Sequence, residues 1–254
     1  MEALALAEPR SGAQFPVSTM VPSPIGPVPT YLAEPSTPGP HPAVIIIHDV
    51  FGADPDLTAQ ADWLARAGFL AVAPDLFHHG GKIGCIRRAI QDLRERKGRT
   101  FLDVEAVRGW AAADPRCSGQ VGVIGFCMGG GFALLMAALY PYAAASVNYG
   151  QVPKDPEEVL AGSCPLVGSY GGRDRTLRGA APKLEQALTQ LGIPHDVREY
   201  PAAGHGFMNQ HTGFVPTVIA KIGGIGYEGS AAEDARRRIV AFFDEHLRAL
   251  PATD

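Results

Sequence analysis

The sequence lacks the features that mark nucleic-acid-binding, disulfide-stapled and low-complexity proteins. Only 19% of its 254 residues are charged and the formal net charge is −4, so there is no basic excess for nucleic acid; the longest basic cluster, 236–238, fits a helix face. The four cysteines have no metal-ligand spacing and are expected to be reduced intracellular thiols. Glycine and proline make up about a fifth of the chain, below the share typical of low-complexity sequence.

The sequence predicts neither a targeting segment nor a membrane-spanning segment. The N-terminus has no cationic region and its apolar patch ends at Glu8-Pro9, which predicts no signal peptide and a cytoplasmic protein. Residues 121–147 carry no charge and are long enough to cross a bilayer. They begin with β-branched residues, however, and are interrupted by Gly125, by three glycines from Gly129 and by Pro141. This pattern favours a buried strand, a tight turn and a buried helix.

What the chain does contain is a regular alternation of short apolar runs and amphipathic segments. Two β-prone runs, 15–21 and 28–33, flank a proline-rich turn and predict an antiparallel hairpin. The alternation that follows predicts an α/β fold, with a mostly parallel sheet and helices on both faces. One domain, 15–250, is expected after a loose segment, 1–14. The expected strands are 43–47, 69–73, 120–124, 143–148, 164–170 and 196–200. The expected helices are 55–67, 85–97, 100–113, 129–139, 156–160, 181–191 and 231–250. Asp54 is expected to cap the first of these helices and Thr100 the third.

The most informative string is Gly125-Phe126-Cys127-Met128-Gly129-Gly130, between an expected strand and an expected helix. It matches the nucleophile-elbow pattern with cysteine in the serine position. A sharp strand-to-helix turn holds the reacting side chain clear of the sheet, and glycine two residues before and after it leaves room. The thiol would lie at a helix N-terminus, which favours thiolate, and the Met128 N–H is placed to donate to an oxyanion. A buried, inert cysteine is the alternative.

Two later motifs supply possible partners for this thiol. Asp174 follows an expected strand within Gly171-Gly172-Arg173-Asp174, and His205 follows the last strand within Gly204-His205-Gly206-Phe207. Nucleophile, acid and then histidine is the chain order of the triad on this architecture. His205 would accept the thiol proton and protonate the leaving oxygen, and Asp174 would orient the imidazole. A turn-forming aspartate and a structural histidine are the alternatives for each residue taken alone.

On these residues the sequence resembles the dienelactone hydrolase (carboxymethylenebutenolidase) family of the α/β-hydrolase superfamily, over residues 17–248. The resemblance rests on the cysteine elbow, His48-Asp49-Val50-Phe51-Gly52, Pro74-Asp75-Leu76-Phe77 and the glycine-flanked Asp174 and His205. It implies hydrolysis of an ester or lactone through an acyl-cysteine, with Cys127, Asp174 and His205 as the triad. It also implies an oxyanion hole formed by the N–H groups of Val50 and Met128.

The chain departs from the family pattern at three positions. Asp49 stands where the family usually has a glutamate that holds the resting thiol; a turn-forming role is the alternative for this shorter side chain. His79 and Asn209 stand where dienelactone hydrolases clamp the substrate carboxylate with two arginines, and neither replaces a bidentate arginine contact. A neutral or less acidic ester, thioester or lactone is therefore the expected substrate. Candidate pocket walls are Phe51, Phe77 and Phe207, with core packing as the alternative for the first two.

Other site types find little support in the sequence. His78 and His79 lack Cys or carboxylate partners at ligand spacing, so no metal is expected, and the glycine spacing near Gly125 fits no dinucleotide fingerprint, so no cofactor is expected. The predicted protein is a monomeric or small homo-oligomeric hydrolase of small esters or lactones, without nucleic-acid or membrane partners. A ligand-binding or sensor protein with little turnover and an acyltransferase are the alternatives. Residues 207–230 show no clear period and are expected to form a flap over the pocket.

Overall fold

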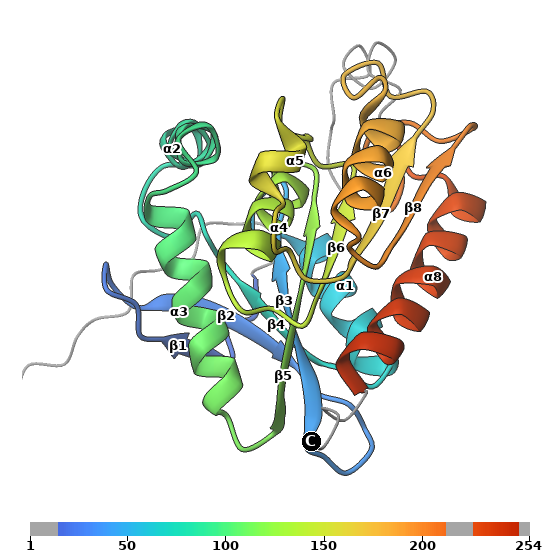
Figure 1. The fold of residues 1–254 in the computed structure, drawn as a ribbon. Helices are drawn as coiled ribbons and strands as arrows, with labels where there is room; N and C mark the ends of the chain where they lie inside the picture. Colours follow the sequence, from blue (N-terminus) through green and yellow to red (C-terminus); the bar gives the residue numbers. More distant parts are fainter. Residues whose placement is uncertain (1–14, 212–225, 249–254) are drawn as a thin grey trace, which may run out of the picture.

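The computed structural model describes residues 15–211 and 226–248, which form an eight-stranded sheet with helices on both faces (Figure 1). The expectations for 1–14 and for most of the flap (212–225) lie outside the described residues. The strands are β1 (Thr19–Val21), β2 (Val28–Ala33), β3 (His41–Ile47), β4 (Leu70–Pro74), β5 (Cys117–Phe126), β6 (Ala144–Asn148), β7 (Leu166–Gly171) and β8 (His195–Tyr200).

The strand order in the sheet is β1-β2-β4-β3-β5-β6-β7-β8. The hairpin strands β1 and β2 pair antiparallel, β2 pairs antiparallel with β4, and all the remaining pairs are parallel. The predicted α/β fold with an opening hairpin is therefore confirmed. Because β3 to β8 run in the same direction, the loops that follow them gather along one edge of the sheet, where sites of such folds form.

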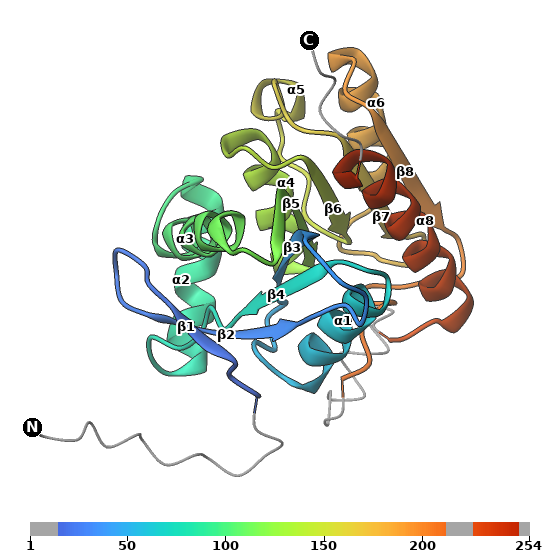
Figure 2. The ribbon, with the colours of Figure 1, turned by 90° about the horizontal axis from the view of Figure 1, so that it is seen from below.

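The helices cover the two faces of the sheet in separate layers. Side chains of β3 alternate between them: Ile45 and Ile47 pack in the core cluster shared with α3, α4 and α6, whereas Val44 and Ile46 pack in the cluster shared with α1 and α8. Figure 2 shows α1 on the opposite side of the strands from α3 and α4. The helices are α1 (Pro55–Arg66), α2 (Lys82–Glu95), α3 (Arg99–Ala113), α4 (Met128–Leu139), α5 (Pro156–Val159), α6 (Ala180–Leu191) and α8 (Gly229–Arg248).

Of the two helix caps predicted from the sequence, the structure confirms Asp54 and not Thr100. Asp54 is the N-cap of α1, as expected, and its side chain accepts a hydrogen bond from the Leu57 N–H. The prediction that Thr100 caps α3 is wrong. Thr100 lies within α3, and the Asp92 carboxylate of α2 accepts hydrogen bonds from both its N–H and its hydroxyl group, each at 2.9 Å. A cap supplied by another helix leaves no local signal in the sequence.

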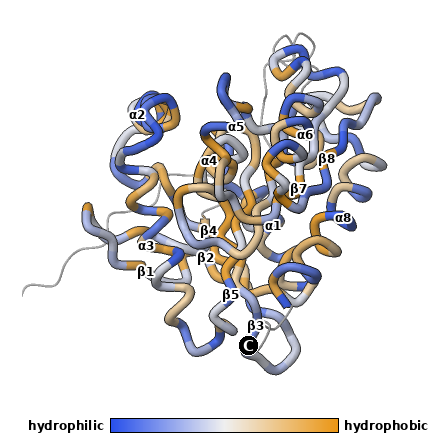
Figure 3. Tube along the Cα trace, viewed as in Figure 1, coloured by the Kyte–Doolittle hydropathy of each residue, from blue (hydrophilic) through white to orange (hydrophobic). Residues whose placement is uncertain are grey.

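The uncharged segment 121–147 forms most of β5, the turn, α4 and β6, as predicted. In Figure 3 the hydrophobic part of the trace runs through the central strands. Among the described residues, no helix is both long and apolar enough to span a bilayer.

Helix α2 is the most loosely packed of the longer helices. It begins three residues earlier than expected and buries only Ala89 and Asp92, while Ile83 and Ile90 are 69% and 38% exposed. Figure 1 shows α2 standing apart from the neighbouring helices. An apolar side of this helix therefore remains open beside the edge of the sheet where the candidate site lies.

Candidate active site

Cys127 occupies the sharp turn between β5 and α4. Its φ of +55° is rare for a residue with a side chain and stores backbone strain in this turn. A Cβ at Gly125 would lie 1.9 Å from the Gly129 carbonyl oxygen, and one at Gly129 would lie 2.2 Å from the Ile47 carbonyl oxygen. Only glycine permits these two backbone approaches, which together hold the start of α4 against β5 and the end of β3.

Three distant side chains meet at this turn. His205 Nε2 lies 3.0 Å from Cys127 Sγ, and His205 Nδ1 lies 2.6 Å from Asp174 Oδ2. The Asp174 side chain is fully buried, and its other oxygen accepts hydrogen bonds from the N–H and hydroxyl group of Thr176. The carboxylate is thus fixed on both sides, so it holds the imidazole with Nδ1–H toward itself and Nε2 toward the sulfur.

The charges in this group stabilise one another. Burial by itself would lower the pKa of His205, but hydrogen bonds to Asp174 and Cys127 outweigh it and raise the pKa to about 10. Burial would raise the pKa of Asp174, but its hydrogen bonds to His205 and Thr176 outweigh that effect and lower the pKa. The aspartate is therefore ionised, and the site favours a positive charge on the imidazole.

The sulfur opens into a cavity of about 610 Å³, a size typical of small-molecule sites. Val50, in the loop after β3, and Met128, the first residue of α4, both line it beside Cys127. Residues at a helix start have N–H groups without intrahelical partners, so the Met128 N–H is available at the edge of this cavity. Apolar side chains make up much of the remaining wall.

Tyr149 is a site residue that sequence reasoning missed. Its ring packs edge-on against His205, with centroids 5.4 Å apart, and its hydroxyl group hydrogen-bonds the Asn209 side chain. It follows β6 with a φ of +43°, so the chain turns there and presents the ring to the cavity. The only signal in the sequence is its position just after an apolar strand and before Gly150.

Asp49 has partners other than the thiol. Its carboxylate accepts a hydrogen bond from the Phe51 N–H at 2.7 Å and forms an ion pair with His211 Nε2 at 2.8 Å. His211 Nδ1 lies 2.9 Å from Asp54. Burial would lower the pKa of His211, but the two carboxylates raise it to about 10. Within the described part of the chain, Asp49 therefore ties the loop next to Val50 to the segment that follows His205, rather than holding Cys127.

The other five expected binding residues also lie outside the walls of the Cys127 cavity. Phe51 packs against His211 and Phe77 against His48, whereas Phe207 is fully buried between Tyr149 and Tyr200. Asn209 is buried and bonds Tyr149 and Asp56, so its amide is already occupied. Phe77 and Phe207 therefore pack in the two core clusters, whereas Phe51 is half-buried against His211 and belongs to neither.

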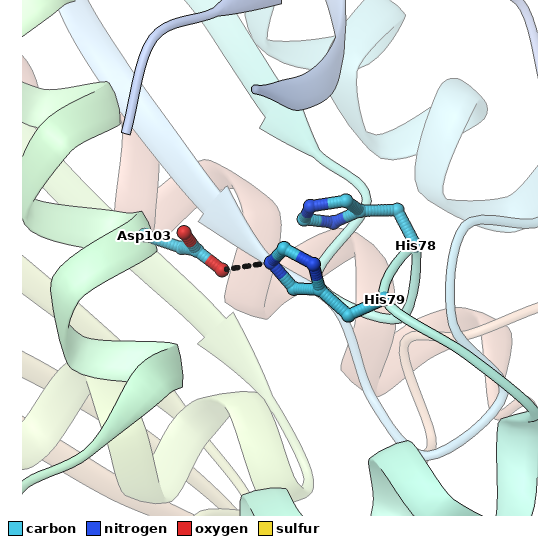
Figure 4. A group of neighbouring side chains, drawn as sticks. All are labelled: His78, His79 and Asp103. Carbon is cyan, nitrogen blue, oxygen red and sulfur yellow. Dashed lines mark hydrogen bonds and ion pairs between the residues drawn. The ribbon is translucent and has the colours of Figure 1, made fainter. Parts of the chain in front are cut away.

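His79 belongs to a separate cluster (Figure 4). Its Nε2 lies 3.3 Å from the buried Asp103 carboxylate of α3, and its ring lies against that of His78, tilted by 42° with the centroids 3.6 Å apart. These three residues bring one ligand atom each within 4.8 Å of one another, as do Asp54, Asp56 and His211. In the second group the polar atoms already form ion pairs and hydrogen bonds, and Arg99 lines the small pocket beside the first. The expectation that no metal is bound stays a prediction.

Comparison with known proteins identifies the family. The model of the "Dienelactone hydrolase family" matches residues 28–247. A carboxymethylenebutenolidase from Rhodococcus opacus is 31% identical over 231 residues, covering 87% of each chain. A solved structure from Klebsiella pneumoniae, 26% identical, has a TM-score of 0.74 over 89% of this chain and 97% of that one. A dienelactone hydrolase structure from Anabaena variabilis has a TM-score of 0.66 at 22% identity, over 91% of this chain and 97% of that one. The chain is therefore a hydrolase that belongs to the dienelactone hydrolase family.

Proposed function

We propose that this protein hydrolyses small carboxylic esters or lactones through an acyl-cysteine formed on Cys127. The observation that carries the proposal is the continuous contact from Sγ through the His205 imidazole to the Asp174 carboxylate, at 3.0 and 2.6 Å. These distances allow one proton to pass between sulfur and nitrogen without any rearrangement. The adjoining cavity gives a carbonyl group room to approach the sulfur.

In the first half of the reaction, Cys127 Sγ bonds to the carbonyl carbon, while the proton that sulfur shares with His205 Nε2 is held on the imidazole, whose pKa is raised. The carbonyl electron pair moves onto oxygen, where the N–H groups of Met128 and Val50 donate hydrogen bonds to the developing charge. The pair then returns, the bond from carbon to the leaving oxygen breaks, and that oxygen takes the proton from Nε2. Asp174 stays ionised throughout and stabilises the imidazolium.

In the second half, water attacks the thioester carbon while His205 Nε2 takes one of its protons. When the intermediate collapses, the carbon–sulfur bond breaks and the sulfur recovers a proton from Nε2. The products are the free acid and the resting thiol. Only the ester and one water molecule are consumed, and the triad returns to its starting state.

The test uses p-nitrophenyl acetate with wild type, Cys127→Ala and Cys85→Ala. Removal of the nucleophile should lower kcat/KM by roughly 10³-fold or more. The matched control removes a thiol that lines a different pocket, so it should keep the wild-type rate. Intact-protein mass spectrometry after rapid quenching should find one acyl group, absent from Cys127→Ala. Equal rates for wild type and Cys127→Ala would reject this nucleophile.

The same experiment separates the alternative functions. Acylation that stops after one equivalent would indicate a binding or sensor protein. Faster product formation with an added alcohol or thiol, together with the transferred ester, would indicate an acyltransferase.

A further inference from the structure

Gly131 differs from the other glycines of the elbow. A Cβ at Gly125, Gly129 or Gly130 would lie 1.9–2.7 Å from backbone atoms, so those positions require glycine. A Cβ at Gly131 would lie 3.4 Å from Leu93 Cδ2, which is ordinary van der Waals contact with a side-chain tip. Gly131 also lies inside α4, where glycine is less favourable than alanine. Close backbone packing therefore does not explain the glycine at position 131. The missing side chain instead leaves an unfilled space beside α4.

The space lies in the cavity that contains Cys127. Gly131 lines it with Met128 and Leu135, at i, i+3 and i+7 on one face of α4, and opposite them Ile90 and Leu93 line it from α2. The face of α4 from Met128 to Leu135 spans roughly 10 Å at about 1.5 Å per residue. The cavity is thus a groove with apolar walls, and Ile90 remains 38% exposed along it.

The topology places this groove on the acyl side of the reaction. Asp174 and His205 follow β7 and β8, on one side of β5, whereas α2 follows β4, on the other side (Figure 1). The leaving oxygen must face His205, which protonates it. The acyl part bonded to Cys127 then extends away from the imidazole, toward α2 and α4.

We propose that this groove binds the acyl part of the substrate as an elongated apolar chain, and that Gly131 keeps the groove open. This inference rests on the proposed hydrolysis through Cys127. At about 1.2 Å per bond in an extended chain, a groove of roughly 10 Å accommodates about eight chain atoms. The cationic side chains Arg94, Arg96 and Lys154 also line the cavity and are exposed, so the apolar walls end where these charges meet solvent.

The test measures kcat/KM for p-nitrophenyl esters from acetate to decanoate. Each methylene buried in the groove should raise kcat/KM by about threefold to fourfold until the groove is filled. Acetate and octanoate differ by six methylenes, so the octanoate-to-acetate ratio of wild type should reach about 10³, with no further rise for decanoate.

Gly131→Leu places a side chain in the groove and should lower the octanoate-to-acetate ratio at least about tenfold. Gly109→Leu is the matched control, because Gly109 is an exposed glycine inside α3 with no atom within 4 Å of a built Cβ. It should keep the wild-type ratio. If Gly131→Leu does not fold, judged by circular dichroism, Leu93→Trp on the loosely packed α2 fills the same space from the opposite wall and should lower the ratio in the same way.

If kcat/KM of wild type does not change with acyl chain length while hydrolysis still depends on Cys127, the proposal that the groove binds the acyl chain is refuted, and the proposed function remains. A folded Gly131→Leu or Leu93→Trp variant with the wild-type ratio would also refute binding of the acyl chain in the groove. No hydrolysis of any ester would overturn the proposed function, and this inference with it.

Discussion

Replacing His211 by glutamine should destabilise the protein in a pH-dependent way. The imidazole bridges Asp49 and Asp54 at 2.8 and 2.9 Å, and these carboxylates raise its pKa from 6.5 to about 10. A rise of that size corresponds to at most about 5 kcal/mol of unfolding free energy. The His211 and Asp54 side chains are 14% and 23% exposed, so solvent screening reduces the expected loss to about 2–3 kcal/mol.

The sign of the pH dependence follows from the raised pKa. Below about pH 6.5 the imidazole is protonated in both the folded and the unfolded chain, so its full contribution to stability is present. As the pH rises toward the folded-state pKa of about 10, the unfolded chain loses the proton first and the contribution declines. Wild type should therefore exceed His211→Gln in stability most at pH 6 and least above pH 10.

Urea unfolding followed by tryptophan fluorescence at pH 6, 8 and 10 measures this difference. His41→Gln is the control, because its ring bonds the Thr37 carbonyl oxygen near solvent and forms no ion pair among the described residues. It should change the unfolding free energy by less than about 0.5 kcal/mol at each pH. A His211→Gln effect that stays constant from pH 6 to 10, or one no larger than the control, would refute the reasoning.

Three further predictions concern the triad, a helix cap and the cysteines. Asp174→Asn should retain the fold but lower kcat/KM for a short ester by about 10³- to 10⁴-fold, because the amide stabilises the wrong tautomer of His205; a loss below tenfold would contradict this role. Asp92→Ala removes the cap of α3 and should cost about 1–2 kcal/mol in urea unfolding, and an unchanged midpoint would count against it. Burial raises the pKa of Cys164 to about 12, so peptide mass spectrometry at pH 8 should find iodoacetamide on Cys127 before it appears on Cys164, and equal labelling of the two thiols would contradict this prediction.

The features that could be predicted from the sequence are those encoded by neighbouring residues. The strand, turn and helix around Cys127 follow from an apolar run and the glycines that flank it. Asp54 followed by Pro55 predicts the start of α1 because both residues act on the first turn. The chain order of Cys127, Asp174 and His205 anticipates their meeting, because the loops after parallel strands share one edge of the sheet.

The features that sequence reasoning missed depend on residues far apart in the chain. Asp49 could not be assigned a partner, because its ion pair with His211 joins segments whose relative position only the fold determines. The contact between His79 and Asp103 has the same origin. The groove walls were also missed, since apolar residues on α2 have the same pattern whether they face a packed core or a cavity.

Because α2 buries few of its side chains, its sequence can change during evolution more readily than that of the core. Most core positions tolerate few replacements, but α2 buries little and still supplies Ile90, Leu93 and Arg94 to the wall of the site. Mutations there can accumulate at small energetic cost while reshaping what the protein accepts. The residues that stabilise the fold are thus largely different from the residues of α2 that line the site. New substrate selectivities would therefore arise first through substitutions in α2.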